Sequence, residues 1–199
     1  MASSEVAICN LALGRIGISI FISSLTEASN EARVCSVFYE PCRDMVLQDF
    51  PWNFASKRAA LANLGTPPTN WLFRYQLPSD CLEARHIVVP GLRQPRSGQR
   101  IAYEVSVEND VKVLYTDQQD AELFYTTRVT NPNLFSPLFV MALGWLIGAE
   151  AAMPLTAAPG LGDAARRNYA LAISAAGSAS LREQEAGPEP DSEFITARL

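Results

Sequence analysis

Apolar residues recur at the spacing of an α-helix near the start of the chain. The first such run predicts a helix over residues 4–16, with a serine that caps its start and a glycine that follows its end. A second run predicts a helix that begins at Ser29 or Asn30. Pro41 lies inside this run and is expected to kink the helix, and Pro51 is expected to end it.

The middle of the chain has the alternating and β-branched stretches that are typical of strands. The clearest turn signal is Glu108-Asn109-Asp110, which lies between two alternating stretches and predicts a β-hairpin. We expect a small, mostly antiparallel sheet. The predicted strands are residues 54–61, 72–76, 82–89, 101–107, 111–115 and 123–129.

Helical spacing returns after this β-rich stretch. A third helix is predicted over residues 136–153, with Ser136 as its cap, Pro137 in its first turn and Pro154 as its stop. A fourth is predicted over residues 163–181.

The third helix contains an apolar run over residues 138–149, which we tested as a membrane span. Spanning a bilayer takes about 20 apolar residues, so the run is too short and predicts a buried helix instead. Gly144 and Gly148 have the G-x-x-x-G spacing that lets a second helix approach closely, and we regard them as candidate interface residues.

This order of elements predicts an α+β fold, in which about four helices form a bundle and a small, mostly antiparallel β lobe is inserted between the second and third helices. The predicted parts are residues 1–51 for the first two helices, 52–130 for the β lobe, 131–181 for the last two helices, and 182–199 for an extended C-terminal tail.

The tail is acidic and contains two prolines, so alone it is expected to be disordered. It also contains Phe194, Ile195 and Leu199 as apolar residues and Arg198 as a charged one. One interpretation is a frayed end. The other is a segment that orders on a neighbouring subunit or another partner, with these four residues as its anchors.

The net charge of −5 argues against a uniformly basic nucleic-acid binder. Arg93, Arg96 and Arg100 form a small basic loop that suits phosphate groups or an acidic partner, although such loops are often only solvated. Four cysteines without a C-x-x-C pair and a single histidine predict buried thiols, no metal site and no cofactor.

No motif in the chain predicts catalysis. The G-x-G-x-x-A match at residues 160–165 follows a helix, whereas a dinucleotide fingerprint follows a strand. His86 lies in a predicted strand whose alternation directs it away from Cys81. The carboxylate pairs Asp117 with Asp120 and Glu108 with Asp110 lie in predicted turns, where acidic residues serve local hydrogen bonds.

Several stretches in a fixed order resemble the tail tubular protein A family, the head-to-tail adaptor of short-tailed bacteriophages. They cover nearly the whole chain and are AICNLALGRIG at 7–17, LQDFPWNFA at 47–55, FRYQLPSDCL at 73–82, RVTNPNLFSPLFVMAL at 128–143 and AEAAMPLT at 149–156.

The resemblance implies a structural virion protein of the tail or neck, assembled in the host bacterial cytoplasm. It implies a homo-oligomeric ring of about a dozen copies between the portal protein and the tail nozzle protein, with tail fibres as a further partner. The genome passes through the centre without specific binding, and no membrane is involved. The family has no catalytic motif to transfer to this chain.

Two other functions remain open at this point. One is a virion-associated enzyme that degrades peptidoglycan, which needs an acid/base pair of carboxylates. The other is a small soluble binding module. An assembled ring under native conditions favours the adaptor, and a monomer that clears a cell-wall suspension favours the enzyme.

Overall fold

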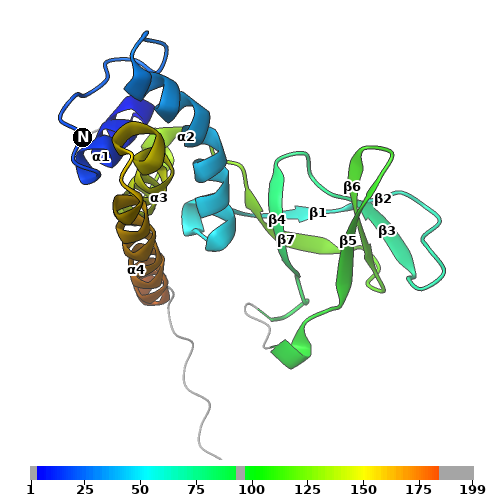
Figure 1. The fold of residues 1–199 in the computed structure, drawn as a ribbon. Helices are drawn as coiled ribbons and strands as arrows, with labels where there is room; N and C mark the ends of the chain where they lie inside the picture. The colour runs from blue at the N-terminus through cyan, green and yellow to red at the C-terminus, as the bar shows by residue number, and fades with distance from the viewer. Residues whose placement is uncertain (1–3, 93–96, 184–199) are drawn as a thin grey trace, which may run out of the picture.

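The computed structural model describes residues 4–92 and 97–183, which fold into a helical part and a β lobe that lie side by side (Figure 1). This arrangement confirms the predicted α+β class. The helices are α1 (Glu5–Arg15), α2 (Asn30–Asp49), α3 (Pro137–Thr156) and α4 (Pro159–Glu183). The strands are β1 (Ser56–Ala60), β2 (Ala62–Asn63), β3 (Phe73–Gln76), β4 (Cys81–Ile87), β5 (Tyr103–Glu108), β6 (Val111–Thr116) and β7 (Glu122–Thr127), and short 3-10 turns lie at Asn53–Ala55, Ser97–Gln99 and Pro132–Leu134.

A serine caps each of the first three helices. The side chains of Ser4, Ser29 and Ser136 accept hydrogen bonds from backbone N–H groups three residues further on, at 3.1, 3.2 and 3.3 Å. These bonds satisfy N–H groups that have no partner inside the helix. The predicted starts of these helices are therefore confirmed, with Ser29 rather than Asn30 as the cap of α2.

The prolines and glycines in the second half end helices less often than predicted. The structure has α3 continuing past Pro154 to Thr156, where Ala157 adopts a left-handed conformation with φ of 52°. A proline removes only one backbone hydrogen bond, and the packing of the helix outweighs that loss in the last turn. The fourth helix begins at Pro159, before the predicted start at residue 163, so the G-x-G-x-x-A match lies in the first turns of α4. In the first half, α2 runs through Pro41 to Asp49, so it ends just before Pro51 as predicted.

In the helical part, α3 is the central element. It contacts α1, α2 and α4, and its ten buried residues exceed the seven of α2 and the four of α1. Gly148 lies directly against α1, because a Cβ atom there would be 3.3 Å from the carbonyl oxygen of Ala12. Gly144 faces Leu11 and Arg15 of the same helix. The contact of both glycines is therefore made inside the chain.

Among the described residues, α3 alone is long and apolar enough to cross a membrane by length and composition. The helix is longer than the apolar run of residues 138–149, so length by itself does not exclude a span. Mean hydropathy in its most apolar window is 1.7, and 56% of that window is buried inside the protein. The core helix of a soluble protein has the same properties, so hydropathy alone does not separate the two cases.

The β lobe contains two antiparallel sheets where one was predicted. Their strand orders are β1-β7-β4 and β2-β3-β6-β5. The chain changes sheets at Leu61, which separates β1 from β2 and donates a backbone hydrogen bond to Ala121. Both sheets enclose one apolar core that contains Leu61, Tyr75, Leu114 and Leu123. A single residue between two short strands leaves no signal in the alternation, so the sequence pattern could not separate the sheets.

The predicted hairpin is confirmed as β5 and β6. Asn109 and Asp110 connect the two strands with φ angles of 47° and 63°. Positive φ at both turn positions matches the twist of the paired strands, and Asn and Asp tolerate it better than most residues.

Polar contacts attach the β lobe to the end of α2. The Arg85 guanidinium of β4 donates to the carbonyl oxygens of Leu47 and Gln48 at 3.3 and 2.6 Å. These carbonyls lie in the last turn of α2, where they lack partners within the helix and where a cation is favoured. Arg128, just after β7, forms a salt bridge of 3.0 Å with Asp44. The two parts of the molecule are thus held together at one helix end.

Replacing Gly148 by leucine should lower the free energy of unfolding by about 1–3 kcal/mol, because the new side chain would meet the α1 backbone. Urea unfolding followed by circular dichroism measures this. Gly160→Leu is the control, since a Cβ at Gly160 meets nothing within 4 Å. Equal stabilities of the two variants would contradict the close-approach role of Gly148.

Candidate functional site

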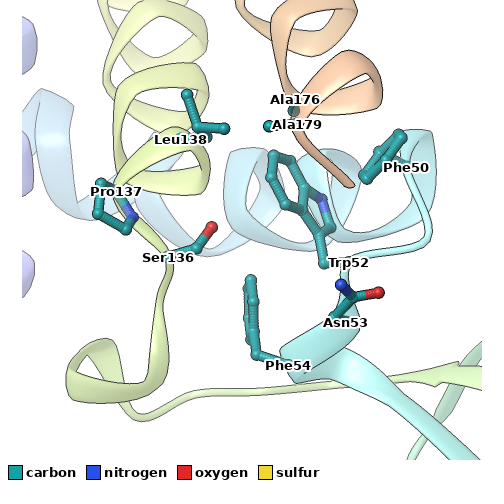
Figure 2. A pocket seen from close by; sticks show the side chains of 9 residues that line it. All are labelled: Phe50, Trp52, Asn53, Phe54, Ser136, Pro137, Leu138, Ala176 and Ala179. Carbon is teal, nitrogen blue, oxygen red and sulfur yellow. The ribbon is translucent and has the colours of Figure 1, made fainter. Parts of the chain in front are cut away.

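An apolar pocket of about 370 Å³ lies where α2 ends, α3 begins and the second half of α4 passes (Figure 2). Phe50, Trp52 and Phe54 contribute aromatic rings from one side, and Leu138 approaches from α3. The complete lining is Phe50, Trp52, Asn53, Phe54, Ser136, Pro137, Leu138, Ala176 and Ala179.

Local chemistry explains why the chain turns at this place. Pro51 ends α2, and the indole nitrogen of Trp52 donates to the Val46 carbonyl oxygen at 2.7 Å. That bond satisfies a carbonyl near the helix end and fixes the indole of Trp52 in the core, where 4% of the residue is exposed. The chain therefore folds back across the end of α2.

Edge-to-face aromatic contacts make this wall of the pocket rigid. The ring of Trp52 lies 5.0 Å from that of Phe50 and 5.2 Å from that of Phe139, at steep interplanar angles of 72° and 88°. Phe54 contacts Phe135 and Phe139 in the same cluster, at 5.9 and 5.2 Å. Such pairs contribute about 0.5–1.5 kcal/mol beyond the area that they bury.

The lining of the pocket has no titratable side chain. The Ser136 hydroxyl already accepts the N–H of Phe139 as the cap of α3. Carbon atoms dominate the rest of the lining. The pocket can therefore bind an apolar side chain or ligand group, and its own residues supply no acid, base or nucleophile.

A second hollow of about 420 Å³ in the β lobe is charged. Asp80 is one of its lining residues, and its carboxylate accepts from Lys57 at 2.7 Å, from the Thr127 hydroxyl at 2.8 Å and from the Tyr125 hydroxyl at 3.1 Å. The hydrogen bond from Lys57, above all, holds the pKa of Asp80 below its usual range. These bonds join β1, β7 and the turn before β4. A structural role therefore explains why an acidic residue lies here.

Most of the residues singled out in the sequence as binding candidates lie outside the described ranges. Arg93 and Arg96 are among them, as are Phe194, Ile195, Arg198 and Leu199. Arg100 is described and exposed. Phosphate binding by the basic loop and docking of the tail therefore stay predictions.

The candidate catalytic residues are not brought together in the described ranges. His86 packs on the ring of Phe124 at 4.8 Å, and burial, with Arg100 and Arg58, lowers the pKa of its imidazole. Burial raises the pKa of Cys81 to about 11, so this residue is a thiol at neutral pH. The described residues also contain no group of three or more His, Cys, Asp or Glu side chains arranged to hold a metal ion.

Two acidic residues of the predicted turns, Asp117 and Glu108, bind partners far away in the sequence. Asp117 accepts the backbone N–H of Leu72 at 3.0 Å. Glu108 accepts from Arg74 at 3.0 Å and from the Tyr115 hydroxyl. Both residues therefore have structural partners, but the expectation of hydrogen bonds within the turn is wrong, because the bonds link segments that lie far apart in the chain.

No pattern in the sequence predicted the apolar pocket. Phe50, Trp52 and Phe54 were visible as aromatic residues around Pro51, but the pocket also needs Ala176 and Ala179, which are more than 120 positions away in the chain. The sequence feature that could have indicated it is the alternation of Phe50, Trp52 and Phe54 around Pro51, which ends α2.

No protein-family model matches this chain, and no curated protein matches it either.

Asp80→Asn should lower the free energy of unfolding by about 1 kcal/mol at pH 7, because the carboxylate is partly exposed and loses charged hydrogen bonds to Lys57 and the two hydroxyls. A carboxyl whose pKa is lowered by folding stabilises the protein above its unfolded pKa, and this contribution is lost as the pH falls through its folded pKa. The difference between variant and wild type should therefore shrink in acid.

Urea unfolding between pH 7 and pH 2 measures this, with Asp110→Asn in an exposed turn as the control. A loss of stability that is the same at every pH would show that the charge of Asp80 contributes nothing.

Proposed function

We propose that this chain is a structural subunit that assembles head-to-tail into a ring, and that the ring is the head-to-tail adaptor of a short-tailed bacteriophage. The resemblance in the sequence supports the adaptor, and one structural feature supports the ring. That feature is a pair of exposed apolar surfaces, one beside α1 and one on α2.

The first of these is the α1 surface, formed by Leu11, Gly14 and Phe21. These residues line a shallow, mostly apolar hollow of about 450 Å³ beside α1. Phe21 is 59% exposed. A large aromatic ring in this position leaves apolar area in water, which favours contact with another protein surface.

The second is the α2 surface, formed by Val37, Pro41 and Met45. The three residues follow one another at intervals of four on α2 and share one side of that helix. Val37 is 60% exposed and Met45 is 51% exposed. In Figure 1, α1 and α2 lie on opposite sides of α3.

Two different apolar surfaces suit a heterologous interface, in which the α2 surface of one copy contacts the α1 surface of the next. Such contacts give a closed ring when the rotation between copies closes. The acidic balance of the chain also suits a conduit, because DNA is repelled from a negative wall rather than held there. The portal and the tail nozzle are then the partners above and below the ring.

Phe21→Glu and Met45→Glu should each abolish the ring, because each places a charge in a contact that buries apolar area. Native mass spectrometry over a range of protein concentrations measures the copy number. Leu171→Glu is the matched control, since Leu171 on α4 is 67% exposed and belongs to neither surface.

Each variant keeps one intact surface, so an equal mixture of Phe21→Glu and Met45→Glu should give a heterodimer and nothing larger. Wild-type protein that stays monomeric at every concentration would contradict the ring. A monomer that also clears a cell-wall suspension would favour the peptidoglycan-degrading enzyme, and an inactive monomer would favour a small binding module.

A further inference from the structure

The apolar pocket at the junction of α2, α3 and α4 is a built site without an assigned role. Trp52 and the aromatic rings packed around it hold its shape, and Ser136 fixes the start of α3 at its edge. Phe50, Phe54 and Leu138 are only half-buried, so an incoming apolar group would cover them further. We propose that this pocket receives Phe194 from the segment 184–199 of a second copy of the chain.

The chemistry of the pocket fits an aromatic side chain. Its volume of about 370 Å³ lies near the lower end of ligand pockets, about 300–1,000 Å³, which suits one ring with a neighbouring aliphatic group better than a larger molecule. Aromatic rings on one side offer edge-to-face partners to a new ring. Within the segment 184–199, Phe194 is the one aromatic residue.

The position of the pocket on α4 favours a donor from another copy. Ala179 lies four residues before Glu183, the last residue of α4, so the pocket is about 6 Å back along the same helix. To fill its own pocket, the segment would have to reverse its direction at the helix end and return.

The ten residues between Glu183 and Phe194 oppose such a reversal. They contain Pro188, Pro190 and four acidic residues, with no lysine or arginine to balance them. Like charges and prolines favour an extended chain, for which ten residues at about 3.1 Å each span about 30 Å. That distance is about the diameter of a small domain, so it reaches the next subunit of a ring and overshoots the donor's own pocket.

This inference rests on the proposed self-association, and the two are tested separately in the same samples. Ala179→Cys is placed on one tagged full-length chain and Phe194→Cys on a second chain with a different tag. The chains are mixed at a concentration at which the wild type associates, and a mild oxidant is added. A disulfide that links the two differently tagged chains forms only if the segment of one copy lies at the pocket of another.

The matched control replaces Ala170 instead of Ala179. Ala170 is exposed, and nine positions along α4 place it on the opposite side of the helix from Ala179. The four native cysteines are buried, and they provide the same background in every sample. We expect the mixed disulfide with Ala179→Cys at a yield at least about tenfold above that with Ala170→Cys, as for a specific contact of about 1.4 kcal/mol.

A chain that carries both Ala179→Cys and Phe194→Cys distinguishes the donor. If it closes an internal disulfide at a rate that does not change on dilution, and the mixed chains do not link, the occupant is the chain's own segment and the proposal is wrong. If native mass spectrometry finds rings in the mixture but no link forms above the control, the pocket inference fails while the ring stands. If every sample is monomeric, both fail.

Phe194→Ala in the otherwise native chain gives a second measurement. It should weaken self-association by about tenfold or more, because an aromatic side chain no longer leaves water on assembly. Thr196→Ala, a smaller change in the same segment, should leave self-association within about twofold of the wild type. Equal dissociation constants for Phe194→Ala and the wild type would overturn the proposal.

Discussion

The burial of α3 between α1, α2 and α4 is the constraint on which the rest of the structure depends. An apolar helix of this length is stable in water only when other elements cover it, so the distant helices α1 and α2 and the following helix α4 meet around it. Small residues let them come close. Gly148 admits the backbone of α1, and Gly162 of α4 lies equally close to the Ala149 carbonyl oxygen of α3.

The β lobe follows from the same arrangement, because it is inserted between α2 and α3 and must leave and rejoin the helical part at one place. Trp52 turns the chain at the end of α2, and Arg85 returns from β4 to bind the carbonyl oxygens of that helix end. The segment that leaves α2 and the strand that returns to it are therefore both bonded to the same helix end. Burial lowers the pKa of Arg85, and its hydrogen bonds to carbonyls at the negative end of a helix offset the cost of removing the charge from water.

The apolar pocket is a by-product of that junction, which gives it a different character from an enzyme site. Enzyme pockets bring a few polar groups together at one point, whereas this one is walled by aromatic rings and alanines. The charged cluster around Asp80 lies in the β lobe and is used up in joining strands. The exposed apolar side chains include those beside α1 and on α2, and such surfaces suit contacts with other proteins.

The sequence by itself determined the local elements and the fold class. Three helix starts were predicted from Ser4, Ser29 and Ser136, and a hairpin was predicted from Asn109-Asp110. Both kinds of signal are local, because caps and tight turns depend on a few neighbouring residues. The continuous apolar run at residues 138–149 also indicated that α3 is a buried helix.

Only the tertiary structure decided which surfaces meet. The separation of the β lobe into two sheets at Leu61, the continuation of α3 through Pro154, and the pocket between Trp52 and Ala179 all depend on contacts between residues far apart in the chain. A residue pattern reports which face of an element is apolar. It does not report which other element covers that face, since any apolar partner of suitable shape removes the same area from water.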